Sequence, residues 1–352
     1  MRSAGSPRRS PCSGPRWSGS RPTSPRPTPT MSDAGSTWAV LSVYSPDRSL
    51  LANLEAIGEQ VDRVIVVDDH GPEPDEELFI ALVEQGVELY RQPDNLGIAA
   101  ALNRGIAVAF ARGADAVVLF DQDSAPPPGM IAALRRTVDE AKEAGIDAAF
   151  AVPEFWSATR QVMATDPSGV LLAREPIQSG TYLPRSSWED LGPLREDLFI
   201  DLVDVEYALR AEAAGMPPVA APGTRLGHRL GAAYRRPWWA GGFARSPLPA
   251  TVTLSAPFRY YYRVRNRRVL NRAYGRRFSG RLAIATLVEA LHAVEVVAFS
   301  RPRSRMLRAM VRGWRDGGGE SALGRMPEAV LADLRTVRWA LRPLAATAEP
   351  PE

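Results

Sequence analysis

Between residues 38 and 152, short apolar runs alternate with segments of helical periodicity, and this alternation restricts the fold more than any other feature. The apolar runs have the length of buried strands and lie at Trp38–Val43, Val61–Val67, Val87–Tyr90, Ala116–Phe120 and Ala148–Val152. Helices are expected between them at Leu50–Ile57, Glu76–Gln85, Ile98–Ala111 and Pro128–Ala144. Such alternation is typical of βαβ units, so it predicts a mainly parallel sheet covered by helices on both faces.

From about residue 153 the alternation is less regular. Short strands are expected near Val170–Ala173 and Ile177–Leu183, and a helix at Val203–Ala214. Gly215 should end this helix, because glycine is the usual residue in the left-handed conformation just past a helix C-terminus. The sequence contains no internal repeat.

Charge divides the chain into three parts. Residues 1–30 contain six Arg, no acidic residue and almost nothing to bury, so we expect 1–34 to be a disordered extension. Residues 31–256 hold 18 basic and 32 acidic residues, whereas 257–315 hold 15 Arg and two acidic residues. We therefore expect an α/β domain at 35–255 and an Arg-rich helical region at 256–345, which is a candidate for membrane association.

Several classes of protein are excluded by what the sequence lacks. A single Cys rules out a disulfide framework and a Cys-based zinc site. No GxGxxG follows the first expected strand and no GxxxxGK[ST] occurs, which disfavours a dinucleotide-binding domain and a P-loop. There is also no GxSxG nucleophile elbow.

Acidic side chains follow two of the expected strands at the point where each ends. Asp68 and Asp69 follow the second strand, and Asp121 and Asp123 follow the fourth. Ligands of open α/β sheets lie beyond the carboxyl ends of the strands. Carboxylates gathered there are typical of a divalent cation held by one or two carboxylates and by substrate phosphates. The alternative is that Asp121 and Asp123 only cap the helix that starts near Pro128.

A second acidic group precedes the helix at Val203–Ala214. Asp201 could be its N-cap, with Asp204 and Glu206 in the opening turns, where a helix dipole favours negative charge. Asp204 also follows an apolar stretch, and partial burial would raise its pKa toward that of a general base. The sequence leaves both interpretations open.

The chain has three His. His70 and His292 are expected to be incidental. His228 lies between Gly227 and Gly231 in GHRLG, and these glycines allow a close backbone approach.

Taken in order, these blocks resemble the family 2 glycosyltransferases of the GT-A fold, and most of all the bacterial dTDP-rhamnosyltransferases that build surface polysaccharides. The resemblance runs from about Trp38 to Pro327 and is carried by the following segments: VVDD (66–69), NLGIAAALNRGI (95–106), FDQDS (120–124), SGTYLPR (179–185), LFIDLVDVEYALRAEAAG (198–215), GHRLG (227–231) and RYYYRVRN (259–266). It implies a GT-A catalytic domain at 35–255, with a mostly parallel central sheet, flanking helices and a helical C-terminal section.

The resemblance also implies roles for single residues. In the donor site, Asp69 would contact the base or ribose, Asp121 would lie near the sugar or ribose, and the neighbours would be Tyr44, Asn95, Gly97 and Asn103. Asp123 would be the direct metal ligand of the DxD motif, and His228 would complete the metal and diphosphate site. Asp204 would be the catalytic base.

Two positions depart from the family pattern, and both border the nucleotide pocket. Ser45 stands where members often have Asn, and Gly71-Pro72 stands where they often have Gly-Ser. The nucleotide of the donor is therefore the part of the function that these residues leave open.

The Arg-rich region allows three interpretations. Its arginines and the cluster Tyr260-Tyr261-Tyr262 could bind nucleic acid, or belong to a packed helix with solvated arginines. We favour a face for anionic lipid headgroups, without nucleic-acid binding. Leu282–Phe299 contains Glu289, His292 and Glu295, so we expect an amphipathic helix and not a membrane span.

These observations predict a metal-dependent inverting glycosyltransferase that uses Mg²⁺ or Mn²⁺. It would move L-rhamnose from dTDP-rhamnose onto a growing, lipid-linked cell-surface glycan. It would lie in the cytoplasm, peripheral on the inner face of the bacterial plasma membrane. The alternatives are galactofuranosyl or other hexosyl transfer from a UDP-sugar, a nucleotidyltransferase, and a non-catalytic basic membrane or RNA adaptor.

Overall fold

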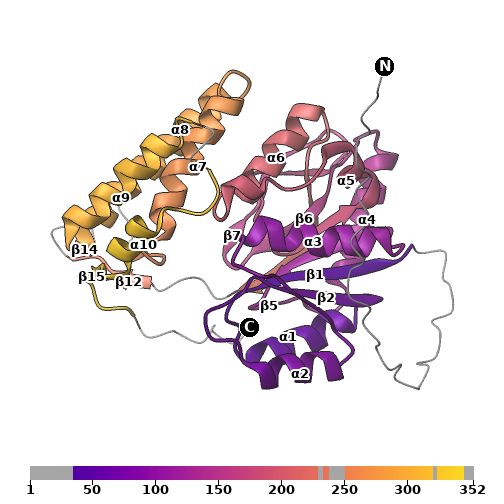
Figure 1. Ribbon diagram of the computed structural model, residues 1–352. Coiled ribbons are helices and arrows are strands. Elements are labelled where there is room, and N and C mark those ends of the chain that lie inside the picture. The colour runs from indigo at the N-terminus through magenta and orange to yellow at the C-terminus, as the bar shows by residue number, and fades with distance from the viewer. Residues whose placement is uncertain (1–34, 229–232, 238–249, 320–322, 345–352) are drawn as a thin grey trace, which may run out of the picture. The chain divides into compact units, whose positions relative to one another are not determined.

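A computed structural model of the protein describes residues 35–228, 233–237, 250–319 and 323–344. The predicted extension at 1–34 lies outside the described residues. From Gly35 onward the chain forms one compact unit, built around an 11-stranded sheet (Figure 1). Its strands are β1 (Thr37–Val43), β2 (Arg63–Asp68), β3 (Glu88–Arg91), β4 (Ala116–Asp121), β5 (Ser124–Ala125), β6 (Ala151–Trp156), β7 (Thr159–Arg160), β8 (Val162–Thr165), β9 (Leu171–Ala173), β10 (Thr181–Pro184) and β11 (Val219–His228).

The sheet confirms the predicted parallel arrangement in its central strands, to which antiparallel strands are added. Its order is β3-β2-β1-β4-β10-β6-β11-β9-β8, with β5 on β11 and β7 on β6. β1 is parallel to both β2 and β4, and β2 is parallel to β3. β10 runs antiparallel between β4 and β6. The fifth predicted strand begins at Ala151 and not at Ala148, because pairing with Val219 of β11 sets its start.

Helices cover both faces of the sheet, as predicted. The helices of this part are α1 (Ser49–Gly58), α2 (Glu76–Glu84), α3 (Ile98–Ala111), α4 (Met130–Glu143), α5 (Arg185–Leu191) and α6 (Val203–Ala214), with a 3₁₀ turn η1 (Glu196–Leu198). Alternate residues of β1 enter different cores, since Val40 packs with α3 and α6 whereas Leu41 packs with α1, α2 and α4. The predicted bounds of α3 and α6 match the structure, and Gly215 ends α6 in the left-handed conformation.

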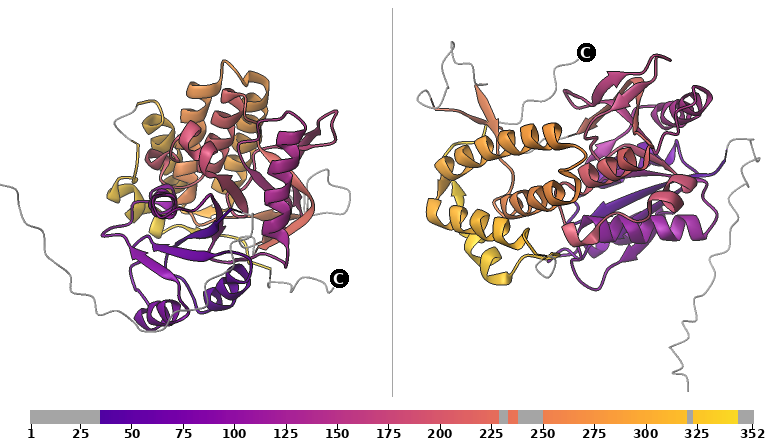
Figure 2. Two further views of the ribbon diagram at one scale, coloured as in Figure 1. Left: turned by 90° about the vertical axis from the view of Figure 1, so that its right-hand side faces the viewer. Right: turned by 90° about the horizontal axis from the view of Figure 1, so that it is seen from above.

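The C-terminal section has its own apolar core. Its helices are α7 (Arg259–Tyr274), α8 (Ser279–Phe299), α9 (Arg303–Asp316) and α10 (Glu328–Arg335), and its short strands are β12 (Ala233–Arg235), β13 (Thr251–Thr253), β14 (Ser300–Arg301) and β15 (Arg338–Trp339). Figure 2 shows these helices gathered together beside the sheet. Tyr260, Tyr261 and Tyr262 are buried in this core, and Phe199 from the segment before α6 joins them.

One expectation for this section needs correction. Arg265 and Arg267 are 0% and 7% exposed, so these arginines face the protein interior and cannot line a membrane surface. α8 is long and apolar enough to cross a membrane by length and composition, and only 17% of its apolar window is buried. Its acidic residues pair with arginines of the neighbouring elements, and its assignment as an amphipathic helix stays a prediction.

Candidate active site

The carboxyl ends of β1, β2 and β4 meet at one edge of the sheet. Val43 lies opposite Asp68 and Ser42 lies opposite Asp121 in the strand register. Asp69 follows directly, and its backbone N–H donates to the carbonyl of Val43 at 2.9 Å. The register therefore brings the two acidic strand ends to the same edge, as the sequence predicts.

Gln122, which sequence reasoning left without a role, joins the end of β1 to the DxD loop. Its side-chain oxygen accepts a hydrogen bond from the N–H of Tyr44 at 2.9 Å, and its carbonyl accepts one from the side chain of Asn53 at 3.0 Å. The ring of Tyr44 stays 48% exposed at this edge. An exposed aromatic ring beside the strand ends is suited to stacking on a planar base.

Two buried serines support the loop from below. The N–H of Asp121 donates to Ser179 Oγ at 3.0 Å, and Ser179 Oγ donates to Ser124 Oγ at 2.8 Å. Ser124 also pairs with His228 across β5 and β11, which brings the backbone of His228 beside the DxD loop. The side chain of His228 lies outside what the structure describes.

Asp121 and Asp204 interact through their charges. The pKa of Asp121 rises to about 7, mainly because of burial and then because of the charges of Asp123 and Asp204, while Arg259 opposes the rise. Burial also raises the pKa of Asp204 to about 6, and the N–H of Val205, 2.8 Å away, opposes it. The pKa values of both Asp121 and Asp204 are thus raised toward neutrality. Two neighbouring carboxyls with such raised pKa values are typical of a catalytic site.

The capping alternatives for these acidic residues are not what the structure shows. α4 begins after Gly129 and α6 after Leu202, and neither N-terminus has a side-chain cap. Asp201, the expected cap of α6, instead pairs with Arg259 through two carboxylate oxygens at 2.7–3.1 Å. Asp204 lies on the first turn of α6, as one of the two interpretations predicts, and accepts the N–H of Val205.

Asp69 orders the loop that leads into α3. It is 4% exposed, and its carboxylate accepts hydrogen bonds from Gln92 Nε2, Leu96 N and Gly97 N at 2.9–3.0 Å. Burial raises its pKa, and these hydrogen bonds act against the rise. The structure gives Asp69 a loop-holding role, and its contact with the donor stays a prediction.

Gly97 is the point where this loop touches the segment before α6. Its φ is +92°, and a Cβ there would lie 2.4 Å from the carbonyl oxygen of Phe199, so only glycine fits. The next residue, Ile98, donates its N–H to that same carbonyl at 3.0 Å. Asn95 accepts a hydrogen bond from Gly97 N at 3.2 Å, which closes the turn.

Asn103 lies deeper in the protein than its predicted donor-site role requires. It is 7% exposed, and its amide bonds Leu194 through both N and O at 2.9 Å and Glu196 at 2.8 Å. The structure thus gives Asn103 a bracing role between α3 and η1, and its assignment to the donor site stays a prediction.

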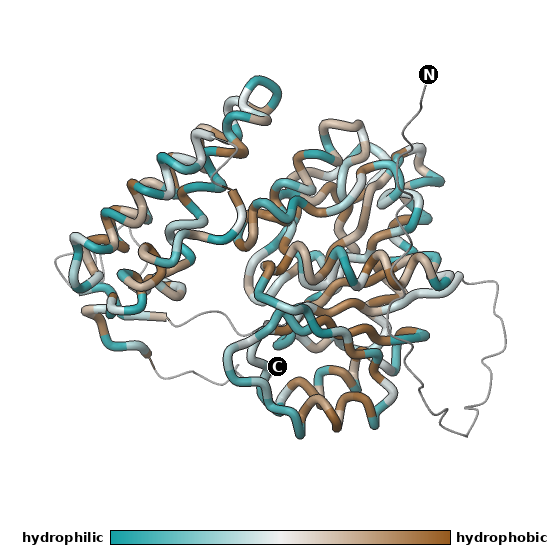
Figure 3. Tube along the Cα trace, in the orientation of Figure 1, coloured by the Kyte–Doolittle hydropathy of each residue, from teal (hydrophilic) through white to brown (hydrophobic). Residues whose placement is uncertain are grey.

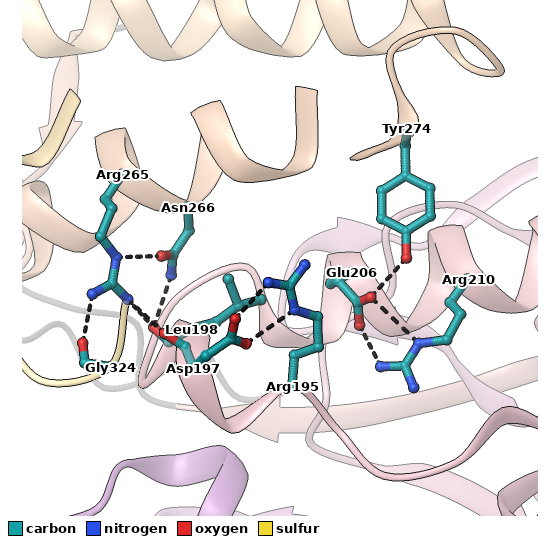
Figure 4. Close-up of polar contacts among 9 residues, drawn as sticks. All are labelled: Arg195, Asp197, Leu198, Glu206, Arg210, Arg265, Asn266, Tyr274 and Gly324. Atoms are coloured by element: carbon teal, nitrogen blue, oxygen red, sulfur yellow. Dashed lines mark hydrogen bonds and ion pairs between the residues drawn. The ribbon is translucent and has the colours of Figure 1, made fainter. Parts of the chain in front are cut away.

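The segment between η1 and α6 has an unusual backbone. Phe199, Asp201 and Leu202 all have φ between +63° and +66°. Such non-glycine residues cost of the order of 1–3 kcal/mol each and persist only where their surroundings hold them. The clamp formed by Arg265 and Asn266 of α7 is what holds this segment (Figure 4).

The clamp works through backbone carbonyls. The Asn266 amide donates to the carbonyls of Leu198, Ile200 and Asp201 at 2.7–3.0 Å. Arg265 donates to Leu198 O at 2.7 Å and to Gly324 O. These side chains belong to the RYYYRVRN block, and they hold the backbone that leads to Asp204.

A second buried contact joins α6 to α7. Glu206 is 1% exposed, accepts from Arg210 at 2.6 Å and accepts from the Tyr274 hydroxyl at 2.7 Å (Figure 4). Asp204, two residues before Glu206, and Tyr207, directly after it, line a small cavity of about 20 Å³, enough for one water molecule. α6 is therefore held from α7 on both sides of Asp204.

Residues 39–178 match the family model of glycosyl transferase family 2. The chain carries a family 2 glycosyltransferase domain. It is 27% identical over 246 residues to the dTDP-rhamnosyl transferase RfbF of Shigella flexneri, a match that covers 65% of this chain and 77% of that protein. The predicted family, enzyme class and GT-A fold are thereby confirmed.

Solved structures give only distant likenesses to this glycosyltransferase. TarS (residues 1–349) of S. aureus in complex with UDP-GlcNAc has a TM-score of 0.44 at 13% identity, over 67% of this chain and 67% of that one. GalNAc-T7 with UDP, GalNAc and Mn²⁺ has a TM-score of 0.44 at 14% identity, over 56% of this chain and 44% of that one.

The family match divides the predicted site residues. Those from Tyr44 to Asp123 fall within 39–178, whereas Asp204 and His228 follow it. The two departures from the family pattern touch each other, because a Cβ on Gly71 would lie 2.5 Å from Ser45 Oγ. Both departures thus alter one place at the ends of β1 and β2.

The acidic residues of this glycosyltransferase fit a divalent ion that arrives with its substrate. Among the described residues, no three His, Cys, Asp or Glu side chains converge closely enough to hold a metal ion. Asp121 and Asp123 do lie close enough for the charge of one to raise the pKa of the other. One or two carboxylates completed by substrate phosphates is the usual arrangement for Mg²⁺.

Proposed function

We propose that this glycosyltransferase moves L-rhamnose from dTDP-L-rhamnose onto a hydroxyl of a growing, lipid-linked cell-surface glycan, with inversion and with a divalent metal ion. The observation that carries the reaction type is the proximity of Asp204, on the first turn of α6, to Asp121 at the end of β4, which is close enough for their charges to interact. The support for rhamnose is the 27% identity to the dTDP-rhamnosyl transferase of Shigella flexneri. We also propose that residues 35–255 carry the reaction, in the cytoplasm at the inner face of the plasma membrane.

Asp204 is the proposed base. A carboxyl with a pKa of about 6 is ionised at neutral pH and still basic enough to accept a proton efficiently. It takes the proton of the acceptor hydroxyl while that oxygen bonds to the anomeric carbon. The bond from the anomeric carbon to the diphosphate oxygen breaks on the opposite face, so the configuration inverts and the nucleoside diphosphate leaves.

Asp123 is the proposed metal ligand, completed by His228, and Asp121 is proposed to lie beside it, near the sugar or ribose. A divalent ion held there would supply positive charge to the leaving diphosphate. Binding it also relieves the repulsion that raises the pKa of Asp121. Tyr44, beside this pair, is placed to stack on the base of the donor.

The second candidate is transfer of galactofuranose or another hexose from a UDP-sugar. This alternative is supported by the contact between Ser45 and Gly71, because both departures from the family pattern lie at that place. A nucleotidyltransferase would release pyrophosphate, whereas a glycosyltransferase releases a nucleoside diphosphate.

The test is a donor panel with the full chain. dTDP-L-rhamnose, UDP-galactofuranose and UDP-GlcNAc are each incubated with Mg²⁺, Mn²⁺ or EDTA, and octyl α-L-rhamnoside serves as the acceptor probe. We expect dTDP release and an inverted product from the first donor, lost in EDTA. Release of UDP alone would support the second candidate, and pyrophosphate would contradict both.

A further inference from the structure

Exposed apolar side chains gather on α8 and α9. Among the described residues, eight of the 14 large hydrophobic side chains with substantial exposure belong to these two helices. They are 40–68% exposed, and they are Ile284, Leu287, Val288, Leu291, Val294, Leu307, Val311 and Trp314. Apolar residues recur in brown along both helices in Figure 3. This set is called the α8–α9 face below.

The α8–α9 face is continuous. Residues 284, 287, 288 and 291 recur at the spacing of one helix face, and so do 307, 311 and 314 on α9. A groove of about 560 Å³ among α7, α8 and α9 joins the two stripes, and Val294, Leu307 and Trp314 belong to both its lining and the face. An exposed apolar surface of this extent marks a site of association with a partner or a membrane.

Around the α8–α9 face, the exposed charges are positive and the negative charges are turned toward the protein. Glu289, Glu295 and Asp316 are the acidic residues between 279 and 316. Each is turned inward and bound by an arginine at 2.8–2.9 Å. The arginines of the same span that stay exposed are Arg301, Arg303, Arg308, Arg312 and Arg315. The outer surface is therefore apolar with a cationic rim.

We propose that the α8–α9 face docks on an anionic lipid bilayer. The apolar side chains enter the boundary between headgroups and acyl chains, and the rim arginines bind headgroup phosphates. The cationic rim favours this occupant over a second copy of the chain, because two such rims would repel each other. The docking surface does not depend on the transfer reaction and is tested without it.

The ion pairs of α8 decide how it meets the bilayer. Glu289 pairs with Arg263 of α7, and Glu295 pairs with Arg236 near β12. A crossing helix would have to break both pairs and place charged groups in hydrocarbon, which is strongly unfavourable. Hence α8 lies along the surface and does not span the membrane.

The test is flotation of the full chain with vesicles of phosphatidylglycerol and phosphatidylcholine, compared with phosphatidylcholine alone. We expect binding to the anionic vesicles that weakens with salt and is released by alkaline carbonate. The triple variant Leu287→Gln, Leu291→Gln, Trp314→Ser should reduce binding about tenfold or more, because apolar burial drives insertion. Arg303→Ala with Arg315→Ala should remove much of the preference for anionic lipid.

A matched control lies on α2. Ile80 is 60% exposed, as is Leu287, but it is far from the C-terminal helices in sequence, so Ile80→Gln should leave vesicle binding unchanged. Unchanged melting temperature and donor binding show that each variant is folded. Failure of the wild type to float, equal loss in Ile80→Gln, or resistance to carbonate would overturn the proposal. So would a triple variant that loses self-association on gel filtration while it still binds vesicles.

Discussion

Arg259, the first residue of α7, grips Asp201 through two carboxylate oxygens, three residues before the proposed base. The same guanidinium lowers the pKa of Asp121, against burial and two neighbouring carboxylates. One side chain therefore links the shape of the segment before α6 to the charge at the end of β4.

The first prediction follows from this link. Arg259→Gln should raise the pKa of Asp121 above its present value of about 7 and move the pH profile of metal binding to higher pH. The control is Arg263→Gln, which breaks a comparable ion pair with Glu289 one turn further along α7. Equal profiles for the two variants would contradict a specific effect of Arg259 on the site.

The second prediction separates Asp123 from Asp204. Asp123→Ala should weaken binding of metal and nucleoside diphosphate together, measured by calorimetric titration. Asp204→Asn should bind them almost normally while turnover falls by roughly 10²–10⁴, the span of general base catalysis. The wild-type rate should rise with pH through about 6 as Asp204 ionises. An Asp204→Asn protein with normal turnover ends the base assignment.

The third prediction concerns stability. Asp121 holds its proton more tightly when folded, so the free energy of unfolding falls as the pH rises from its ordinary 3.8 through about 7. Asp121→Asn should remove this loss and melt at a higher temperature than wild type at pH 8, although it is inactive. Thermal melts at pH 4 and pH 8 measure it, and Asp139→Asn, which is 65% exposed, is the control. A lower melting temperature at pH 8 would refute the charge repulsion.

The fourth prediction tests the clamp of Arg265 and Asn266. Asn266→Ala removes the donor to the carbonyls of Ile200 and Asp201, a loss of about 1–3 kcal/mol for each buried group left unsatisfied, whereas Leu198 O keeps its bond from Arg265. The kcat should fall while the KM for the donor changes little, because Asp204 loses its position. The control is Asn271→Ala, also on α7, which removes one hydrogen bond to Thr286 of α8. It should leave kcat unchanged. A proportional loss in both variants would mean that α7 matters only for stability.

The fifth prediction isolates the close approach at Gly97. Gly97→Ala and Gly113→Ala both put a side chain at φ above +90°, which costs about 1–2 kcal/mol. Only at residue 97 would the new Cβ meet Phe199, whereas at 113 it would meet nothing within 4 Å. Gly97→Ala should therefore unfold in less urea and lose activity, and Gly113→Ala should lose stability alone.

Much of the fold could be predicted from local signals. α3 and α6 match their predicted bounds because apolar periodicity and a C-terminal glycine mark them clearly. The position of β10 between β4 and β6 could not be predicted, because strand order depends on long-range pairing that no local pattern shows. The start of β6 was predicted three residues too early for the same reason. Ala148–Phe150 is as buried as the strand itself, so its apolar sequence does not show that the pairing begins only at Ala151.

The acidic residues of the site could be predicted from the sequence, but the side chains that hold them in place could not. The strand-end register brings Asp69 and Asp121 to one edge as expected from their positions. The charge pattern predicts Arg265 as a surface residue. The sequence does not distinguish a guanidinium that donates to water from one that donates to backbone carbonyls. Buried Arg265 binds the backbone just before Phe199, Asp201 and Leu202, whose positive φ angles no glycine in the sequence signals.

The hold of α7 on the carbonyls of 198–201 limits how this enzyme can be recombined with others. A chimera that takes the sheet and α6 from one parent and the C-terminal helices from another keeps the acidic residues but mismatches their support. Crossover points that keep 198–215 and 259–274 from a single parent should give active hybrids, and those that separate them should not. The two stretches, 44 residues apart in the chain, would then be inherited as one functional block.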